Sequence, residues 1–224
     1  MKTIFITGTS KGIGKALLEE LKREHTVFTI GRKQNDFSLD LTDISNVEKF
    51  EFPEVLTEEV VLINNAGILG EIKRSFEKEK DDTKTVFNCN TIGPIILCNS
   101  FIKAYLNKKL VLINISSGAG RRPIASWSNY CASKAALDMF SETLQLELLE
   151  KNIPAQVFSI APGVVDTAMQ NNIRQSNSSD FSDVQKYRDL EKQLFTPTFV
   201  AKKLSLLINS ENKSLKALLR LEDI

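Results

Sequence analysis

A tyrosine and a lysine stand four residues apart in the stretch NYCASKA, as Tyr130 and Lys134. On a helix, this spacing places both side chains on one face. The simplest interpretation is an ordinary amphipathic turn. The chemical interpretation is a phenol beside an ammonium, which would favour the phenolate and lower the tyrosine pKa from its usual value of about 10. Such a tyrosine could donate a proton to an alkoxide forming at neutral pH.

Two serines upstream of this pair could stabilise charge on a carbonyl oxygen. Ser116 and Ser117 follow the apolar run LVLINI, and Ser117 lies thirteen residues before Tyr130. A hydroxyl at the end of a strand can donate to an oxygen on which negative charge develops. Because adjacent side chains on a strand point to opposite faces, we expect only one of the two serines to face the site.

The segment TGTSKGIG, residues 7–14, could bind phosphate. Its glycines, Gly8, Gly12 and Gly14, come directly after the first apolar run and open a helical pattern. Glycines allow a tight turn and let backbone N–H groups approach a pyrophosphate at a helix N-terminus. A plain strand-to-helix turn is the alternative, but the position after a first strand favours a dinucleotide cofactor.

Basic residues occupy the position at which NAD-binding folds usually carry an acid. That acid ends the second strand and bonds the ribose 2′-hydroxyl, whereas here the run TVFTI is followed by Gly31, Arg32 and Lys33. Arg32 and Lys11 could grip a 2′-phosphate, with a hydrogen bond from Ser10. Each cation could also be merely solvated, but with the acid missing the pattern favours NADP.

The elements that must position these residues alternate along the chain. Apolar runs suited to strands covered on both faces lie at 3–7, 26–30, 60–64, 110–115 and 155–160, and helical patterns lie at about 12–24, 83–106 and 128–151. This alternation predicts an α/β fold, a single Rossmann-type doubly wound parallel sheet with helices on both faces and ligands at the strands' carboxyl ends.

The C-terminal third has a weaker pattern. Pro197 predicts the first turn of a helix that ends near residue 209, and 217–221 is a plausible last strand. The polar segment 170–183 predicts a surface loop or a mobile flap over the strand ends. Whether residues 170–190 form a substrate lid stays open at this point.

Composition bounds the class of protein. The 224 residues fit one domain, 1–224, and the formal charge of +1 shows no basic excess of the kind that nucleic-acid binders carry. Three cysteines without CxxC spacing and a single histidine predict no metal site. No apolar run approaches the ~18 residues of a membrane span. We expect a cytoplasmic protein without nucleic-acid or membrane partners.

Six short motifs together resemble the short-chain dehydrogenase/reductase family, in order and spacing, over essentially the whole chain. They are TGTSKGIG (7–14), NNAG (64–67), NTIG (90–93), ISS (115–117), YCASK (130–134) and PGVVDT (162–167). Within the family, NISSGAG, YCASKAA and APGVVDTAMQNNIR look most like benzil reductases, which are related to sepiapterin reductases and use NADPH. The family's frequent D-G-G ending is absent.

The resemblance implies roles for particular residues. Catalysis would fall to Asn90, Ser117, Tyr130 and Lys134. Asn90 would hold a water in a proton relay through Lys134, although a helix-bending residue bonded to backbone is the alternative. The turn Asn64, Ala66 and Gly67 would line the adenine ribose. The expected contacts of NADP(H) are Gly8, Ser10, Lys11, Gly12, Ile13, Gly14, Arg32, Asp40, Asn65, Ala66, Gly67, Tyr130, Lys134, Pro162, Gly163, Val165 and Thr167.

Three assignments keep an alternative. Asp43 competes with Asp40 for the adenine contact, and either could instead cap a helix. Arg121 and Arg122 could bind an anion or be solvated. Expected substrate contacts are Ser117, Gly118, Trp127, Tyr130, Val164 and Met169, with Ala119, Ile173 and Phe181 nearby, although Trp127 could equally belong to the core.

The large apolar groups in this set suit a bulky carbonyl compound. The sequence therefore predicts an NADPH-dependent carbonyl reductase acting on an aromatic or vicinal dicarbonyl such as benzil. A sepiapterin-type pteridine reductase is the enzymatic alternative. A non-catalytic NADP(H) sensor is the other, and it could dispense with the proton-transfer residues. By resemblance, we expect a homodimer or homotetramer formed through the two long helices.

Overall fold

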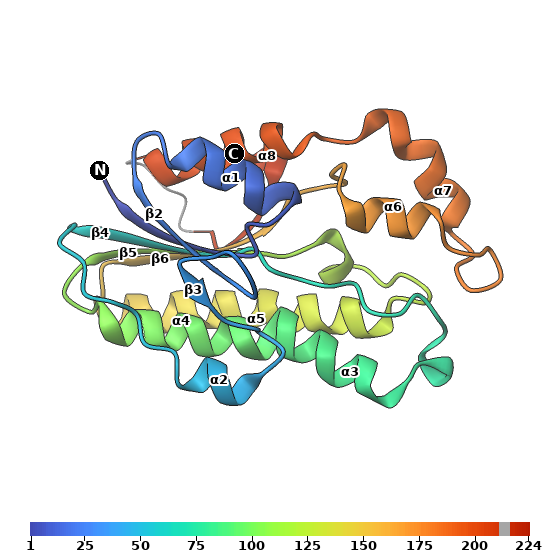
Figure 1. Cartoon of the computed structure of the whole chain (residues 1–224), viewed down its shortest axis with the longest axis horizontal. Helices are drawn as coiled ribbons and strands as arrows, with labels where there is room; N and C mark the ends of the chain where they lie inside the picture. The colour runs from blue at the N-terminus through green and yellow to red at the C-terminus, as the bar shows by residue number, and fades with distance from the viewer. Residues whose placement is uncertain (211–215) are drawn as a thin grey trace.

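The computed structural model describes residues 1–210 and 216–224, and a seven-stranded parallel sheet runs through its centre (Figure 1). The spatial order is β3-β2-β1-β4-β5-β6-β7. The strands are β1 (Thr3–Thr7), β2 (Thr26–Gly31), β3 (Phe37–Ser38), β4 (Glu59–Asn64), β5 (Lys109–Ile115), β6 (Ala155–Ala161) and β7 (Leu218–Arg220). The predicted strands all form, with the two-residue edge strand β3 added.

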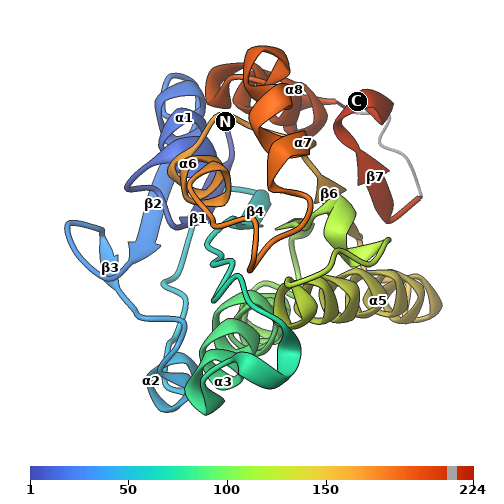
Figure 2. The same ribbon diagram turned by 90° about the vertical axis from the view of Figure 1, so that its right-hand side faces the viewer.

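Helices cover both faces of this sheet, as the doubly wound prediction requires (Figure 1). They are α1 (Gly12–Leu21), α2 (Ile44–Glu48), α3 (Lys80–Phe87), α4 (Gly93–Ala104), α5 (Ser128–Glu150), α6 (Ala168–Arg174), α7 (Val184–Asp189) and α8 (Pro197–Asn209). Helices α1 and α8 lie on one face, and α4 and α5 lie on the other. Figure 2 shows α6 and α7 beyond the sheet, on the side of α1 and α8.

The apolar runs are continuous because each central strand is buried on both sides. In β1, Ile4 and Ile6 pack toward α1 and α8, whereas Phe5 between them packs toward α4. All three side chains are fully buried. The period of two along a strand thus supplies two separate cores, one on each face of the sheet.

The expected long helix over 83–106 is interrupted. A π-helical turn, Asn88–Ile92, separates α3 from α4. Pro94 contributes to this irregularity, because it has no N–H to donate to the carbonyl of Asn90 one helical turn earlier. Lys80–Ala104 is long and apolar enough, by composition, to cross a membrane, but 56% of its most apolar window is buried inside the protein.

The expectation of a loop or flap over 170–183 is wrong for its first part, because α6 runs to Arg174. Ile173 and Phe181 are buried, in an apolar cluster that also contains Trp127 and Tyr187. Two apolar side chains in a polar stretch leave little periodicity to detect. Tertiary burial, rather than the local pattern, therefore stabilises this segment.

Candidate active site

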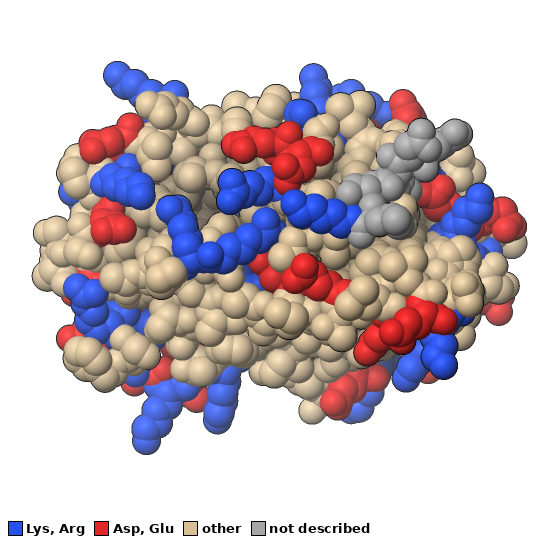
Figure 3. Space-filling view, turned by 180° about the vertical axis from the view of Figure 1, so that it is seen from behind, with Lys and Arg blue, Asp and Glu red and all other residues tan. Residues whose placement is uncertain are grey.

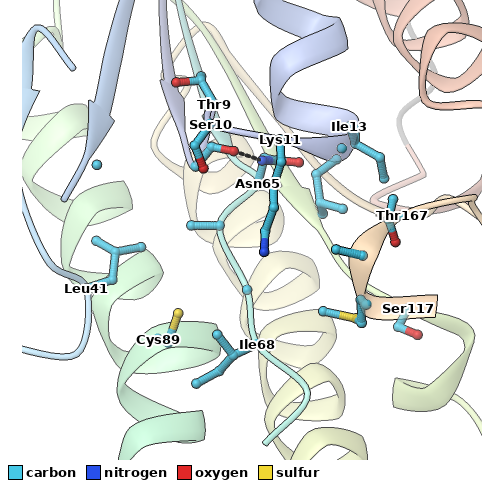
Figure 4. Close-up of a pocket in the computed structure, with 18 of the residues that line it drawn as sticks. Thr9, Ser10, Lys11, Ile13, Leu41, Asn65, Ile68, Cys89, Ser117 and Thr167 are labelled. Atoms are coloured by element: carbon cyan, nitrogen blue, oxygen red, sulfur yellow. Dashed lines mark hydrogen bonds between the residues drawn. The ribbon is translucent and has the colours of Figure 1, made fainter. Parts of the chain in front are cut away.

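A cavity of about 860 Å³ opens at the carboxyl ends of the strands, where the strand order reverses between β1 and β4. Such a reversal leaves a crevice that binds ligands in open α/β sheets. The segments that line it are residues 8–13 after β1, 30–33 at the end of β2, 65–68 after β4, 115–117 at the end of β5, and 162–163, 165 and 167–170 after β6. Figure 4 shows part of this lining.

The glycine loop is shaped by close backbone approaches. Gly8 and Gly12 have φ angles of 73° and 56°, which few other residues adopt. A Cβ on Gly8 would lie 2.9 Å from the Cα of Ala66, and one on Gly14 would lie 2.2 Å from the carbonyl oxygen of Gly8. No side chain caps the N-terminus of α1. This cradle fits a pyrophosphate, because the first N–H groups of the helix are left to an anion.

Asn65 fixes the cradle to the neighbouring strand. Its Nδ2 donates to the carbonyl oxygens of Thr7, at 2.9 Å, and Gly8, at 3.0 Å (Figure 4). The Thr7 hydroxyl accepts in turn from the backbone N–H groups of Asn65 and Ala66. The ends of β1 and β4 therefore hold each other at the point where the strand order reverses.

The end of the cavity near β2 is basic. Lys11, Arg32 and Lys33 line it, and Figure 4 shows the Lys11 side chain extending from the glycine loop into the open space. The acid nearest to β2, Asp36, is turned away and accepts hydrogen bonds from the N–H and hydroxyl of Thr29, both at 2.8 Å. No carboxylate from this turn lines the cavity within the described residues.

The two candidates for the adenine contact, Asp40 and Asp43, have different positions in the structure. Asp40 lines the cavity, and its Oδ1 accepts from the N–H and hydroxyl of Thr42. Asp43 caps α2, where it accepts hydrogen bonds from the backbone and side chain of Asn46.

Tyr130 and Lys134 lie side by side on α5 and are both buried at the cavity wall. The Lys134 Nζ is 5.9 Å from the centre of the Tyr130 ring and donates to the carbonyl oxygen of Ile115 at 2.7 Å. Burial raises the pKa of Tyr130 to about 12, against a smaller lowering by a hydrogen bond with Ser117. Burial also lowers the pKa of Lys134 to about 8.

The expectation that Lys134 depresses the Tyr130 pKa is therefore not met in this structure. Desolvation of the phenolate dominates the Tyr130 pKa, and burial also lowers the pKa of Lys134. A raised pKa keeps Tyr130 protonated at neutral pH, which is the form that can act as an acid.

Ser116 and Ser117 both border the cavity, but the Ser116 hydroxyl is buried, so the expectation that only one of the two side chains would face the site stays a prediction. The strand β5 ends at Ile115, and Ser117 caps the 3₁₀ turn Gly118–Gly120 that follows. The Ser117 hydroxyl accepts from the N–H of Ala119 at 3.1 Å. The Ser116 hydroxyl is buried without a partner in the described part of the chain.

Asn90 lies behind the cavity wall rather than on it. Its side chain accepts from the N–H of Ile68 at 2.9 Å and donates to the carbonyl of the same residue at 2.8 Å. It also donates to the Ser133 hydroxyl at 3.1 Å. The side chain therefore ties the π-helical turn to the loop after β4, which corresponds to the backbone-bonded alternative considered from the sequence.

Most of the other sequence-predicted residues line the cavity, with a few exceptions. Gly14 packs inside the glycine loop, and Gly118 is exposed on the turn after Ser117. The Val164 carbonyl pairs with the N–H of Phe195. Asn64 is buried and donates to Asn114 and Cys98 inside the sheet.

Sequence reasoning missed several apolar residues of the wall. Leu41, Ile68 and Cys89 lie opposite the glycine loop (Figure 4). Ile68 and Cys89 each adjoin a recognised motif, which is the only local signal they carry. Leu41 belongs to the connection after β3, whose two residues are too short to show a strand pattern.

An aromatic wall bounds the substrate end. Trp127 stacks on Phe181 with ring centres 5.4 Å apart, and meets Tyr130 edge-to-face at 5.9 Å. Trp127 is therefore both a core residue and a lining residue. Among the described residues, no three His, Cys, Asp or Glu side chains are grouped to hold a metal.

A nucleotide cradle at a strand-order reversal, joined to Ser117 and the buried Tyr130–Lys134 pair, defines a nicotinamide-dependent oxidoreductase. The short chain dehydrogenase family model matches residues 37–178. The chain belongs to that family, and it is an oxidoreductase.

Among curated proteins, this chain is similar to two named "Benzil reductase ((S)-benzoin forming)". The protein from Bacillus cereus is 33% identical, with 100% of both chains covered. The one from Bacillus subtilis (strain 168) is 36% identical, with 90% of each covered.

Solved structures share the fold. A short chain dehydrogenase/reductase from Saccharomyces cerevisiae superposes with a TM-score of 0.85 at 24% identity, with 100% of this chain and 97% of that chain covered. ElxO with NADP bound superposes with a TM-score of 0.76 at 25% identity, with 98% and 96% covered.

Proposed function

We propose that this protein is an NADPH-dependent carbonyl reductase that reduces an aromatic or vicinal diketone of the benzil type to a hydroxyketone. One observation carries the proposal: a single cavity joins the Ser117, Tyr130 and Lys134 side chains to the basic end formed by Lys11 and Arg32. The names of the bacterial relatives support this substrate class.

The residues present fit a dinucleotide phosphate. The glycine loop and the uncapped N-terminus of α1 would hold the pyrophosphate. Arg32 and Lys11 would hold the 2′-phosphate, a group for which a guanidinium is a good partner. The remaining predicted contacts that line the cavity would hold the adenosine and nicotinamide halves. When bound, NADPH supplies the hydride.

The protein supplies the proton and the orientation. With the hydride supplied by the bound cofactor to the carbonyl carbon, Tyr130 would donate its phenolic proton to the carbonyl oxygen, and a ketone would leave as an alcohol. Ser117 donates a hydrogen bond to the same oxygen and stabilises the charge that develops there. Protonated Lys134 stabilises the phenolate left on Tyr130. Asn90 acts indirectly, because its hydrogen bonds hold the loop after β4 in place.

The apolar wall favours aryl substrates. Trp127, Met169 and Ile173 line the cavity near the catalytic set. Stacking of a substrate ring on Trp127 would add about 0.5–1.5 kcal/mol beyond simple burial. All three cysteines are free, as expected in the reducing cytoplasm, where we place this reaction.

The test is a reductase assay with purified protein, NADPH and benzil, in which NADPH oxidation is followed at about 340 nm and the product is resolved on a chiral column. We expect benzoin as the product, and a lower rate with NADH. Sepiapterin serves as the competing substrate. Turnover of sepiapterin alone would replace the proposal with a pteridine reductase. NADPH binding without turnover of any dicarbonyl would favour the sensor.

A further inference from the structure

Arg121, four residues after Ser117, is bonded within the protein instead of being left to solvent or an anion, although its side chain is 23% exposed. Its guanidinium donates from Nε to the Asp138 carboxylate at 3.0 Å, from Nη1 to the Leu219 carbonyl at 3.2 Å, and from Nη2 to the Ser159 carbonyl at 3.2 Å. One side chain therefore links the loop after β5 to α5, β6 and β7, which lie together at one edge of the sheet (Figure 2). All three nitrogens of the guanidinium donate hydrogen bonds within the protein.

Asp138 is the centre of this cluster. It is 4% exposed and stands one helical turn after Lys134 on α5. Its second oxygen accepts from the Ser159 hydroxyl at 2.5 Å. A buried carboxylate is stable only when paired and hydrogen-bonded, and Arg121 and Ser159 supply both kinds of contact.

The loop that carries Ser117 is pressed against the same turn of α5. A Cβ on Gly120 would lie 2.8 Å from the carbonyl carbon of Lys134 and 3.0 Å from the nitrogen of Ala135. The backbone of the 3₁₀ turn thus touches the helix beside Lys134. The Arg121–Asp138 ion pair is a second link between this turn and α5. Ser117 at one end of the turn and Arg121 at the other are both tied to the segment that carries Tyr130 and Lys134.

We propose that Arg121 and Asp138 form a positioning pair that docks the Ser117 turn onto the catalytic helix and sets the charge balance beside Lys134. The inference rests on the proposed roles of Ser117, Tyr130 and Lys134. Neither member of the pair lines the cavity, so each acts through these residues rather than on substrate or cofactor.

The electrostatic part of the inference has a definite sign. Lys134 is faced by Cys89 from the π-helical turn, by Tyr130 on its own helix, and by Asp138 one turn later. Asp138 favours the charged form of Lys134 and opposes the desolvation that lowers its pKa. Arg121 neutralises part of the Asp138 charge, so the two members of the pair act on Lys134 in opposite directions.

The test compares Asp138→Asn, Arg121→Gln and the double variant with the unmodified protein. The rate of carbonyl reduction is measured from pH 6 to 10, and each protein is checked by thermal unfolding. We expect the pH at which activity falls to move down by about one unit in Asp138→Asn and to move up in Arg121→Gln. The double variant should return close to the original profile.

The positioning of Ser117 is tested separately, by kcat and by the affinity for NADPH. Each single variant should lower kcat by about tenfold, the scale of a misplaced oxyanion donor, and leave the affinity for NADPH within about twofold. NADPH affinity is followed through quenching of Trp127, the only tryptophan. The control is Arg122→Gln, which removes the same charge from the adjacent, exposed position and should change neither profile nor kcat.

Loss of thermal stability with an unmoved pH profile in Asp138→Asn would reduce the pair to an ordinary structural ion pair and overturn the inference. If Arg121→Gln fails to fold, Asp138→Asn, with its profile moved, and the double variant, with its profile restored, still decide the question. If benzil is not reduced, any carbonyl compound that the protein turns over serves for the profile. Failure of the benzil proposal is thereby distinguished from failure of the positioning pair.

Discussion

At the scale of single residues, burial decides the chemistry of the site. Tyr130 and Lys134 are both almost fully buried, so each is shifted toward its neutral form. A neutral phenol is the correct starting form for a proton donor. A lysine whose pKa lies near 8 changes charge within the range of an ordinary assay, which makes its role measurable.

Removal of the Tyr130 hydroxyl tests the proton donor. We expect Tyr130→Phe to lower kcat by at least about 100-fold, the scale of a lost general acid, with little effect on NADPH affinity. The matched control is Tyr105→Phe, which deletes a hydroxyl that donates to the Pro53 carbonyl, on the opposite side of the sheet from α1. That variant should lose some stability and keep its activity. A reductase that survives Tyr130→Phe would rule out this donor.

The pH dependence follows from Lys134. Its pKa is lowered to about 8 by burial, so the protonated form that supports Tyr130 is present below that pH and is lost as the pH rises through it. Reduction at saturating NADPH should therefore fall on the alkaline side with an apparent pKa near 8, a value that belongs to the coupled Tyr130–Lys134 pair. A rate that stays flat up to pH 10 would contradict this account.

At the scale of elements, the turns after parallel strands hold the cofactor site. The turn after β1 approaches the turn after β4 so closely that Gly8 has no room for a side chain. The turn after β2 presents Arg32 and Lys33 to the cavity, while the adjacent Asp36 is tied back to Thr29. We therefore expect cofactor choice to depend on which side chain of this short turn faces the cavity.

Reversal of the charge at this turn tests cofactor choice. We expect Arg32→Asp to weaken NADPH binding by about 10- to 100-fold, the scale of one charge-assisted contact to phosphate, and to change NADH binding far less. Titration of Trp127 fluorescence with each cofactor measures both affinities. Arg23→Asp, an equal charge change at the exposed end of α1, is the control. Equal losses for the two cofactors would remove Arg32 from the 2′-phosphate site.

At the scale of the whole molecule, two cores on opposite faces hold the strand ends in register. Phe5 lies at the centre of one of them, with ring contacts to Phe28, Phe52 and Phe101 among others. Charged residues of both signs are mixed over the face shown in Figure 3, in keeping with the net charge of +1.

Truncation of this central ring tests the core. We expect Phe5→Ala to lower the free energy of unfolding by about 3–5 kcal/mol, because a fully buried aromatic side chain leaves a cavity that its neighbours fill only partly. Denaturant unfolding measures the loss. Phe76→Ala, at a ring that is 87% exposed, should be nearly neutral.

Assembly through the long helices is the second prediction at this scale. Met139, Leu146 and Leu149 are exposed on α5, and we expect them to be covered in a homodimer or homotetramer. Leu146→Glu should then reduce the molar mass in light scattering, whereas Leu206→Glu on α8 leaves the α5 contact in place. Dissociation by the α8 variant alone would move the interface to the other face of the sheet.

The sequence by itself determined the strand and helix order and the position of the glycine loop, and it predicted the side chains that we propose react. These features are local: a parallel strand buried on both faces reads as a continuous apolar run, and a turn that must approach phosphate needs glycine at defined steps. The spacing from Tyr130 to Lys134 lies within one helix, so it too could be predicted.

Only the tertiary structure decided how those groups behave. Burial reversed the expected shift of the Tyr130 pKa, since desolvation depends on neighbours far away in the chain. In the folded chain, the Asn90 side chain bonds to the backbone of Ile68. Arg121 bonds to Asp138 and to Leu219, which is 98 residues away in the sequence. Contacts of this kind have no local signature, because they depend on which strand ends the sheet brings together.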